Sequence, residues 1–423
     1  MTTAENVSLG TTAGSHATRT KIVVVGGGVA GLEFVLALAE LAPGRADVRI
    51  VSPESVFHYQ PFVVAETFGV GPSFRLDLKN VASDAGAEWR SGEIVSVDHD
   101  HHVSFTAQGE LLSYGLLVVA SGARPEVALP GALTFRGEQD EVAFRALLAE
   151  LRAGTVTSVA FVVPPGASWP LPLYELALMS AAQIRKSGRS RARVRLVLVT
   201  PEGAPLERFD GAASNAVAEL LETAGIEVHC GRYAAELTEN GLRLVPDERL
   251  EVERVVALPR LRGPHFAGLP SDHDGFLPTD LHGRVRGIDD VYAAGDVTSF
   301  PVKQGGIAVE QAGAAAEDVA ARIGVSLRPR PFRPVLRGLL LTGQAPRFLW
   351  GDPTGGSGET SAVAYHPLWW PPGKIAGGRL ARYLSEAGLP VPPPPAGPTT
   401  VPVEIELEAD DDAHASPLPA DPG

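Results

Sequence analysis

The stretch KIVVVGGGVAGL at residues 21–32 decides the fold of this chain. Its β-branched run predicts a buried strand, and its glycines match the pattern Gly-x-Gly-x-x-Gly at the start of an apolar helix. Gly26 permits the tight turn, Gly28 lets the backbone approach a pyrophosphate, and Gly31 allows close packing of helix on strand. The helix N-terminus offers free N–H groups and partial positive charge to phosphates. The expected phosphate-binding residues are Gly26, Gly28, Val29, Ala30 and Gly31.

The second strand of this unit ends at Ser52-Pro53-Glu54. An acid that holds a ribose hydroxyl is expected at the end of this strand. Ser52 occupies the usual position of that acid, and Glu54 lies two residues further on. Both residues are therefore candidate ribose contacts.

The strand, turn, helix and strand of this unit are repeated once along the chain. The second copy covers a strand at 159–163, a helix at 171–185 and a strand at 194–199. Two such units predict an α/β protein with two Rossmann-like three-layer domains plus a small C-terminal domain. The expected segments are a disordered leader at 1–19, one dinucleotide-binding domain at 20–135 and 260–325, a second at 136–259, a C-terminal interface domain at 326–390, and a Pro-rich acidic disordered tail at 391–423.

Composition excludes several classes of function. The chain has 423 residues and a net charge of -14, half of it in residues 391–423, so phosphates are repelled and nucleic acid is not an expected partner. One cysteine, Cys230, forms neither an intramolecular disulfide nor a thiolate cluster and fits a reducing compartment. The run DHDHH at 98–102 falls at an expected hairpin turn, and no metal site is predicted. Without a signal peptide or a bilayer-spanning run, we expect a cytoplasmic protein.

Two motifs downstream complete a pattern with the first glycine turn. Residues 116–125 read LLVVASGARP, and residues 291–297 read VYAAGDV, followed by Gly305-Gly306 and an apolar helix. In this order the three motifs resemble the pyridine nucleotide-disulfide oxidoreductase superfamily. The resemblance implies FAD as cofactor, with Asp296 on the ribityl chain and the helix that opens at Gly305 directed at the flavin pyrimidine. The further cofactor contacts that it implies are Ala120, Gly122, Gly295, Asp296, Gln304, Gly305 and Ile307.

The segment SPESVFHYQP at 52–61 indicates a branch of this superfamily. It is similar to the Ser-Pro-x-x-x-Phe-x-x-x-Pro segment of type II NADH:quinone and sulfide:quinone oxidoreductases, which runs beside the flavin. The resemblance implies a small-molecule electron donor and a quinone-like acceptor. Disulfide reduction and the well-known form of sulfide oxidation use paired cysteines, which the lone Cys230 does not supply. Cys230 is interpreted as a buried structural thiol.

The turn of the second unit argues against a nicotinamide cofactor. Residues 164–172 read PPGASWPLP and keep one glycine of the fingerprint. Proline removes N–H donors, and Trp169 would fill the space that a pyrophosphate needs. Weak or no NAD(P)H binding is therefore predicted. Trp169 either fills the core or lines the pocket of another donor.

Residues 326–390 reverse the charge of the whole chain, with eight basic residues against three acidic ones. They also contain Trp350, Trp369 and Trp370. Tryptophan beside basic residues is typical of segments that rest on an anionic membrane surface. Peripheral contact with the inner face of the cell membrane is one hypothesis, and a homodimer or domain interface is the other.

The first functional hypothesis is therefore an FAD-dependent oxidoreductase that transfers electrons from an unidentified donor to a quinone-like acceptor. The alternatives are an NAD(P)H dehydrogenase of the type II NADH dehydrogenase kind and a flavin-carrying interaction protein without turnover. The catalytic residues are not identified by the sequence. Three weak candidates are Lys303 near the flavin, Tyr59 as a flavin or substrate contact, and Glu66 as a polar group near the isoalloxazine. His58 is offered for the same contact as Tyr59, with a packing or surface role as the alternative for both.

Overall fold

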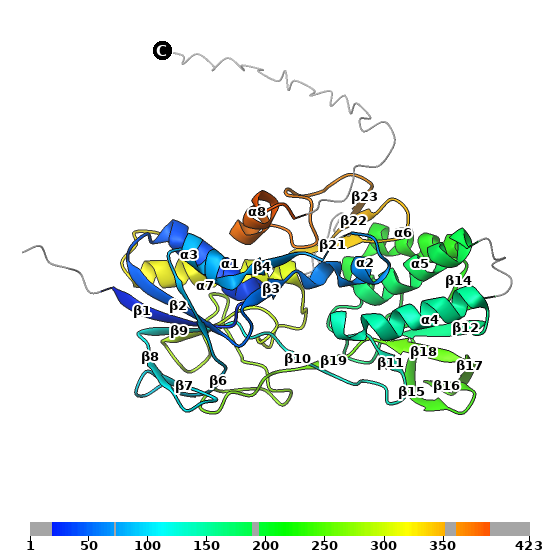
Figure 1. The fold of residues 1–423 in the computed structure, drawn as a ribbon, viewed down its shortest axis with the longest axis horizontal. Helices are drawn as coiled ribbons and strands as arrows, with labels where there is room; N and C mark the ends of the chain where they lie inside the picture. The colour runs from blue at the N-terminus through cyan, green and yellow to red at the C-terminus, as the bar shows by residue number, and fades with distance from the viewer. Residues whose placement is uncertain (1–18, 72, 188–193, 352–360, 390–423) are drawn as a thin grey trace, which may run out of the picture.

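The computed structural model describes residues 19–71, 73–187, 194–351 and 361–389. Figure 1 shows two α/β units side by side, with C-terminal elements over both of them in this view. The expected leader, apart from Arg19, and the expected acidic tail lie outside the described residues.

The first unit contains a five-stranded parallel sheet in the order β20-β9-β1-β2-β5. Helices α1 and α7 pack together with α3 in one apolar cluster, and a small antiparallel sheet, β6-β7-β8, completes the unit. Because layers cover both of its faces, β1 is apolar on both sides and Ile22–Val25 is buried. The bounds are β1 (Thr20–Val25), α1 (Val29–Leu41), β2 (Ala46–Ser52), α3 (Leu78–Asp84), β5 (Glu88–Ser91), β6 (Ile94–Asp98), β7 (Val103–Thr106), β8 (Leu111–Ser113), β9 (Leu116–Val119), β20 (Val291–Ala293) and α7 (Gly305–Arg322).

The second unit repeats this plan with the parallel sheet β11-β18-β12-β13-β14. The chain leaves the first unit through β10 and returns to it through β19, and these two short strands pair antiparallel. The bounds are β10 (Arg124–Glu126), β11 (Leu133–Thr134), α4 (Glu141–Ala153), β12 (Ser158–Val162), α5 (Leu171–Lys186), β13 (Arg195–Val199), α6 (Gly211–Ala224), β14 (Ile226–His229), β15 (Tyr233–Thr238), β16 (Gly241–Val245), β17 (Glu248–Glu251), β18 (Arg254–Ala257) and β19 (Arg260–Arg262). The α/β class and its two Rossmann-like folds are therefore confirmed.

One segment of the first unit, residues 56–77, extends to the second unit; this segment is called the excursion below. It consists of β3 (Val56–His58), a 3-10 turn at Gln60–Phe62, α2 (Val63–Thr67) and β4 (Arg75–Asp77). Val63 and Val64 pack in the core of the second unit, against α4 and α5. The side chain of Arg145 on α4 donates to the backbone carbonyls of Glu66 and Thr67.

The C-terminal elements divide between the two units. The antiparallel sheet β21 (Leu336–Leu340), β22 (Arg347–Gly351) and β23 (Ser361–Ala364) packs on α5 and α6, whereas α8 (Gly378–Glu386) packs on α1. Glu33 on α1 is fully buried and accepts hydrogen bonds from the backbone N–H groups of Arg379 and Leu380. Burial raises the pKa of Glu33 to about 7, against the lowering effect of these two bonds.

Four of the eight basic residues of this segment form ion pairs within the described chain. Ion pairs join Arg330 to Glu317, Arg337 to Glu310, Lys374 to Glu175 and Arg379 to Glu40, and Arg347 stacks on Tyr365. Trp370 is nevertheless 81% exposed. In the described part of the chain, no helix has the length and apolarity needed to cross a membrane.

Two further expectations from the sequence concern the run at 98–102 and Cys230. The run at 98–102 forms the turn between β6 and β7, and among the described residues no three His, Cys, Asp or Glu side chains are placed so that they could hold a metal ion. Cys230 follows β14 as expected, but it is only partly buried, because the turn after the strand leaves it near the surface. Burial raises the pKa of its thiol, and so does the negative charge of Glu202.

Candidate functional site

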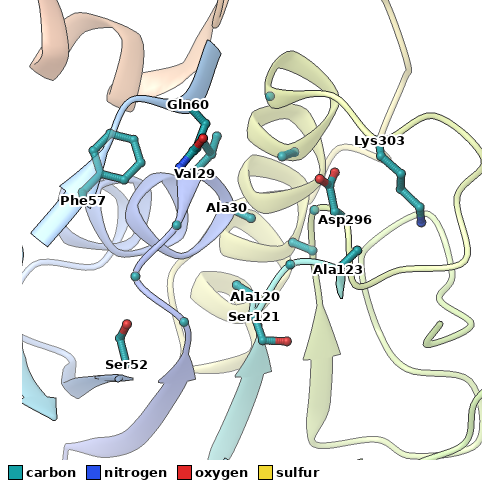
Figure 2. A pocket seen from close by; sticks show the side chains of 18 of the residues that line it. Val29, Ala30, Ser52, Phe57, Gln60, Ala120, Ser121, Ala123, Asp296 and Lys303 are labelled. Carbon is teal, nitrogen blue, oxygen red and sulfur yellow. The ribbon is translucent and has the colours of Figure 1, made fainter. Parts of the chain in front are cut away.

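A cavity of about 840 Å³ lies where the two units and the C-terminal segment meet. It opens at the carboxyl ends of β1 and β9, where the chain order of the sheet reverses and α/β proteins bind their ligands. Figure 2 shows Ala30, Ala120 and Asp296 around its centre. Every candidate cofactor residue from the sequence lines this cavity except Gly31 and Ile307.

The glycine turn fits a close approach of a phosphate. A Cβ on Gly26, whose φ is +108°, would lie 2.4 Å from the Ala120 carbonyl oxygen, and a Cβ on Gly31 would lie 2.1 Å from the Gly26 carbonyl oxygen. These two glycines are therefore required by packing within the protein. Gly28 differs, since a Cβ there would meet nothing within 4 Å and would point into open space at the cavity. Gly28 is also the N-cap of α1 and has no side chain to satisfy the N–H groups of the first turn.

Glu54 follows β2 two residues beyond the usual position of the ribose-binding acid, and it still lines the cavity. Ser52 and Glu54 both line it, and the Ser52 hydroxyl donates to the Glu54 carboxylate over 3.2 Å. The pair thus presents one charge-assisted hydrogen-bonding group at the place where the fold holds a ribose.

Asp296 lies directly after β20 and faces the cavity between α1 and α7 (Figure 2). Gly295 brings it close, because its φ is +81° and a Cβ there would lie 2.9 Å from the Ala30 side chain. Burial raises the pKa of Asp296 to about 6, against the lowering effect of Lys303. In the described part of the chain no protein donor hydrogen-bonds to this carboxylate. The carboxylate is only partly buried and borders the cavity, where sugar hydroxyls would supply its hydrogen-bonding partners.

Hydrogen bonds of the Gln304 side chain hold the start of α7 in place. The Gln304 side chain accepts a hydrogen bond from the Ile307 N–H at 3.2 Å and donates to the Arg337 carbonyl of β21. Gln304 and Gly305 line the cavity, whereas the Ile307 side chain is buried in the core. The partial positive charge of this helix end is therefore directed at the cavity, where it can stabilise negative charge.

The three weak catalytic candidates occupy different places. Lys303 lines the cavity, yet its ammonium donates to the Thr298 carbonyl and lies 3.9 Å from the Phe276 ring centroid. Burial lowers the pKa of Lys303 to about 8. Tyr59 is fully buried and accepts the Ile375 N–H at 2.9 Å, and Glu66 contacts His58. Neither Tyr59 nor Glu66 is part of the cavity lining.

The second unit contributes apolar groups instead of a phosphate cradle. Trp169, Leu171 and Pro172 line the cavity, and Trp169 also packs on Phe209, so it fills core and borders the cavity at once. The acid at the end of β13, Glu202, is buried; its Oε2 atom accepts from Tyr174 at 2.7 Å and from Thr200 at 2.9 Å. An acid sequestered in this way is not presented to a ribose.

Two features of the cavity wall carried no assignment from the sequence. In the sequence, Lys374 was only one of eight basic residues in a charged segment. In the structure it lines the cavity and pairs with the fully buried Glu175 of α5. Gln60 also lines the cavity, and its position in the motif at 52–61 is the one signal that could have singled it out. His58, which the sequence did offer as a flavin or substrate contact, lines the cavity as well.

Two dinucleotide-binding folds around one cavity, with a glycine turn and the Asp296 carboxylate in its wall, are the arrangement expected of a flavin-dependent oxidoreductase. The chain belongs to the pyridine nucleotide-disulphide oxidoreductase family, whose model matches residues 20–317. It is an FAD-dependent enzyme of the branch that contains type II NADH dehydrogenase-like and sulfide:quinone oxidoreductase-like proteins.

Several known proteins are similar to this chain. An NADH dehydrogenase-like protein of Mycobacterium tuberculosis is 30% identical over 302 residues, which cover 66% of this chain and 73% of that protein. The demethylphylloquinone reductase NdbB of Synechocystis is 25% identical over 308 residues, or 66% and 72% of the two chains. The sulfide:quinone oxidoreductase of Aquifex aeolicus shares the fold with a TM-score of 0.75 and 18% identity, covering 87% of this chain and 89% of that one.

Proposed function

We propose that this enzyme transfers electrons from a small-molecule donor other than NAD(P)H, through bound FAD, to a quinone-type acceptor. Backbone N–H groups at 26–31 would hold the pyrophosphate, and Asp296 would hold the ribityl hydroxyls. Bound there, FAD supplies the two-electron chemistry, while the protein supplies position and electrostatics. The start of α7 and the partly buried Lys303 contribute positive charge on the same side of the cavity.

The observation that carries this proposal is the composition of the cavity beyond the cofactor residues. Trp169, Leu171 and Pro172 of the second unit line the cavity together with Gly338 and Leu339 of β21. A flat, largely apolar ring such as a quinone suits aromatic and aliphatic walls. The names of two similar proteins, a demethylphylloquinone reductase and a sulfide:quinone oxidoreductase, support the same class of acceptor.

The nature of the donor is argued from the second unit. Its turn keeps Gly166 but offers prolines in place of N–H donors, and the Glu202 carboxylate is bound by Tyr174 and Thr200. Both features weaken the contacts that a nicotinamide dinucleotide would require. The second candidate remains an NAD(P)H dehydrogenase, which the name of the mycobacterial relative favours.

An anaerobic titration of the FAD-loaded protein separates these candidates. NADH and NADPH should bleach the bound flavin slowly or not at all, whereas a donor from a panel of small reductants should bleach it rapidly. Rapid bleaching by one equivalent of NADH would contradict the proposal and establish the dehydrogenase. Turnover with a soluble quinone after reduction then separates an enzyme from a flavin-carrying interaction protein.

The proposal includes peripheral membrane contact through the C-terminal segment, near the exposed Trp370 and the half-exposed Tyr365. Because four of the eight basic residues there are paired with acidic side chains of the chain itself, an aromatic contribution should exceed the electrostatic one. Trp370→Ala should reduce co-sedimentation with anionic liposomes more than added salt does. Absence of co-sedimentation by the wild-type protein at low salt would remove this part of the proposal and leave a homodimer interface to be tested by ultracentrifugation.

A further inference from the structure

His58 lies at the end of β3, where the excursion of the first unit meets the second unit. Its backbone is paired with Arg75 of β4. The side chain is 9% exposed and forms part of the cavity wall. Gln60, which also lines the cavity, approaches Nδ1 of the His58 ring to 3.3 Å, so this edge of the ring borders the cavity wall.

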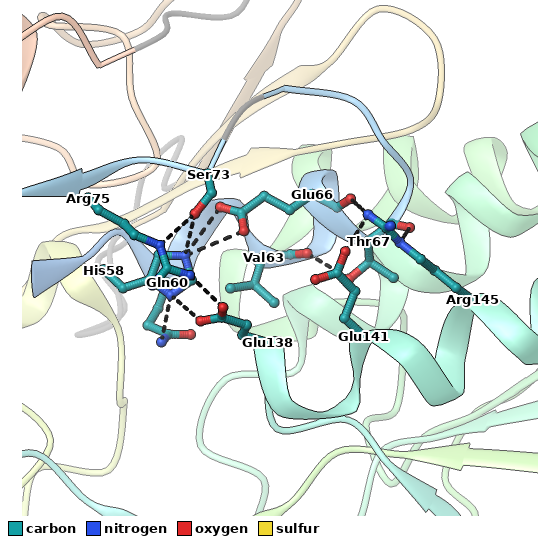
Figure 3. A network of polar contacts seen from close by, with 10 residues as sticks. All are labelled: His58, Gln60, Val63, Glu66, Thr67, Ser73, Arg75, Glu138, Glu141 and Arg145. Carbon is teal, nitrogen blue, oxygen red and sulfur yellow. Dashed lines mark hydrogen bonds and ion pairs between the residues drawn. The ribbon is translucent and has the colours of Figure 1, made fainter.

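Both ring nitrogens of His58 face carboxylates (Figure 3). Nδ1 lies 3.2 Å from Oε2 of Glu138, and Nε2 lies 3.4 Å from the Glu66 carboxylate on α2 and 3.3 Å from the Ser73 hydroxyl. Arg75 completes the group by pairing with Glu138 at 2.5 Å and donating to Ser73 at 3.2 Å.

The two carboxylates differ in their access to water. Glu138 belongs to a 3-10 turn at the start of α4, and its side chain is 47% exposed, whereas that of Glu66 is 9% exposed. The charged groups around the ring are therefore two carboxylates and the Arg75 guanidinium. A histidine ring between an exposed acid and a cavity is suited to carry protons from one to the other.

We propose that His58 is the proton donor to the acceptor bound in this cavity and that Glu138 returns the proton from water. This inference rests on the proposed function, which supplies a quinone as acceptor. A quinone takes up two electrons and two protons, of which bound reduced FAD would supply both electrons and one proton. The second proton leaves Nδ1 of His58, whose N–H bond breaks as an O–H bond forms on the quinol. Glu66 holds the ring through Nε2 and is a positioning residue.

Stopped-flow oxidation of the reduced holoenzyme by menadione tests this role. Measured from about pH 6 to about pH 9, the wild-type rate should fall as the pH rises, because the imidazolium is the donor. His58→Gln keeps hydrogen-bonding groups but has no proton to give, and it should react roughly 100-fold more slowly with a flat pH profile. His99→Gln, in the exposed turn after β6, is the matched control and should behave as the wild type.

Two further measurements are independent of that variant. Glu138→Gln, at a half-exposed position that tolerates the change, should slow the reaction in weak buffer, and a high concentration of a small buffer acid should restore it. In the FAD-free protein, the NMR signal of the His58 ring, assigned by its loss in His58→Gln, should shift in Glu138→Gln, because the two side chains are in contact. A signal at the same position in both proteins overturns the relay.

The two proposals fail differently. Equal rates and equal pH profiles for the wild type and His58→Gln overturn the role of His58 while the quinone reductase activity stands. A wild-type protein that is reduced but never passes electrons to menadione or to other quinones overturns the proposed function, and the acceptor of the His58 proton with it.

Discussion

Replacement of Gly28 by alanine separates the binding of FAD from the folding of the protein. In the FAD-free protein the added methyl group meets nothing within 4 Å, and the backbone at φ -84° and ψ -168° is one that alanine adopts freely. The substitution should therefore raise the stability of the FAD-free protein by about 0.4–1 kcal/mol, through the lower entropy of the unfolded chain. In the loaded protein the methyl group occupies the space of the pyrophosphate. Overpacking of this kind costs about 1–3 kcal/mol, so the Kd for FAD should rise roughly 5- to 150-fold.

The assay is a fluorescence titration of the FAD-free protein with FAD, together with denaturant unfolding of the same sample. Gly31→Ala serves as the contrasting control, since its Cβ would lie 2.1 Å from the Gly26 carbonyl oxygen and should lower the free energy of unfolding directly. If Gly28→Ala binds FAD as tightly as the wild type, the turn at 26–31 is not the pyrophosphate site and the argument built on it is wrong.

The remaining predictions concern three acidic residues. Asp296→Asn should weaken FAD binding about 10- to 100-fold in the same titration, since a hydrogen bond to a charged group contributes about 1.5–3 kcal/mol; unchanged affinity would contradict its role on the ribityl chain. Glu175→Gln leaves the Lys374 ammonium buried without its partner and should cost about 3–5 kcal/mol in denaturant unfolding, and the double variant with Lys374→Met should recover much of this loss. The folded-state pKa of Glu33, about 7, lies above the ordinary value of 4.5, so its contribution to stability is full below about pH 4.5 and is lost as the pH rises through 7. Relative to Glu33→Gln, the wild type should therefore lose up to about 3 kcal/mol of stability between about pH 5 and pH 8.5, and a difference that is independent of pH would refute this.

The first unit could be predicted from the sequence because its signals are local. The β-branched run before Gly26 and the apolar helix after the glycine turn correspond to β1 and α1. Gly295 and Asp296 were recognisable through the resemblance of residues 291–297 to a motif of the superfamily, and Gly295 takes the positive φ that favours glycine.

The excursion at 56–77 and the division of the C-terminal segment could not be predicted. Both depend on contacts between residues hundreds of positions apart, such as the hydrogen bond from Ile375 to Tyr59 and those from the start of α8 to Glu33. A count of basic residues could not show that Lys374 and Arg337 would meet Glu175 and Glu310, because pairing is decided by the tertiary fold. The expected surface charge was therefore too large.

The hydrogen bond from the Gln304 side chain to β21 has a consequence for any attempt to isolate the cofactor-binding half of this enzyme. One amide group both caps α7 and holds the Arg337 carbonyl, so the helix that faces the cofactor depends on a strand that comes after it in the chain. A fragment ending at residue 325 would keep all three glycine motifs and lose that support. The shortest unit able to load its cofactor should therefore extend through β21, and shortening the chain from this end should release the flavin before it unfolds the first sheet.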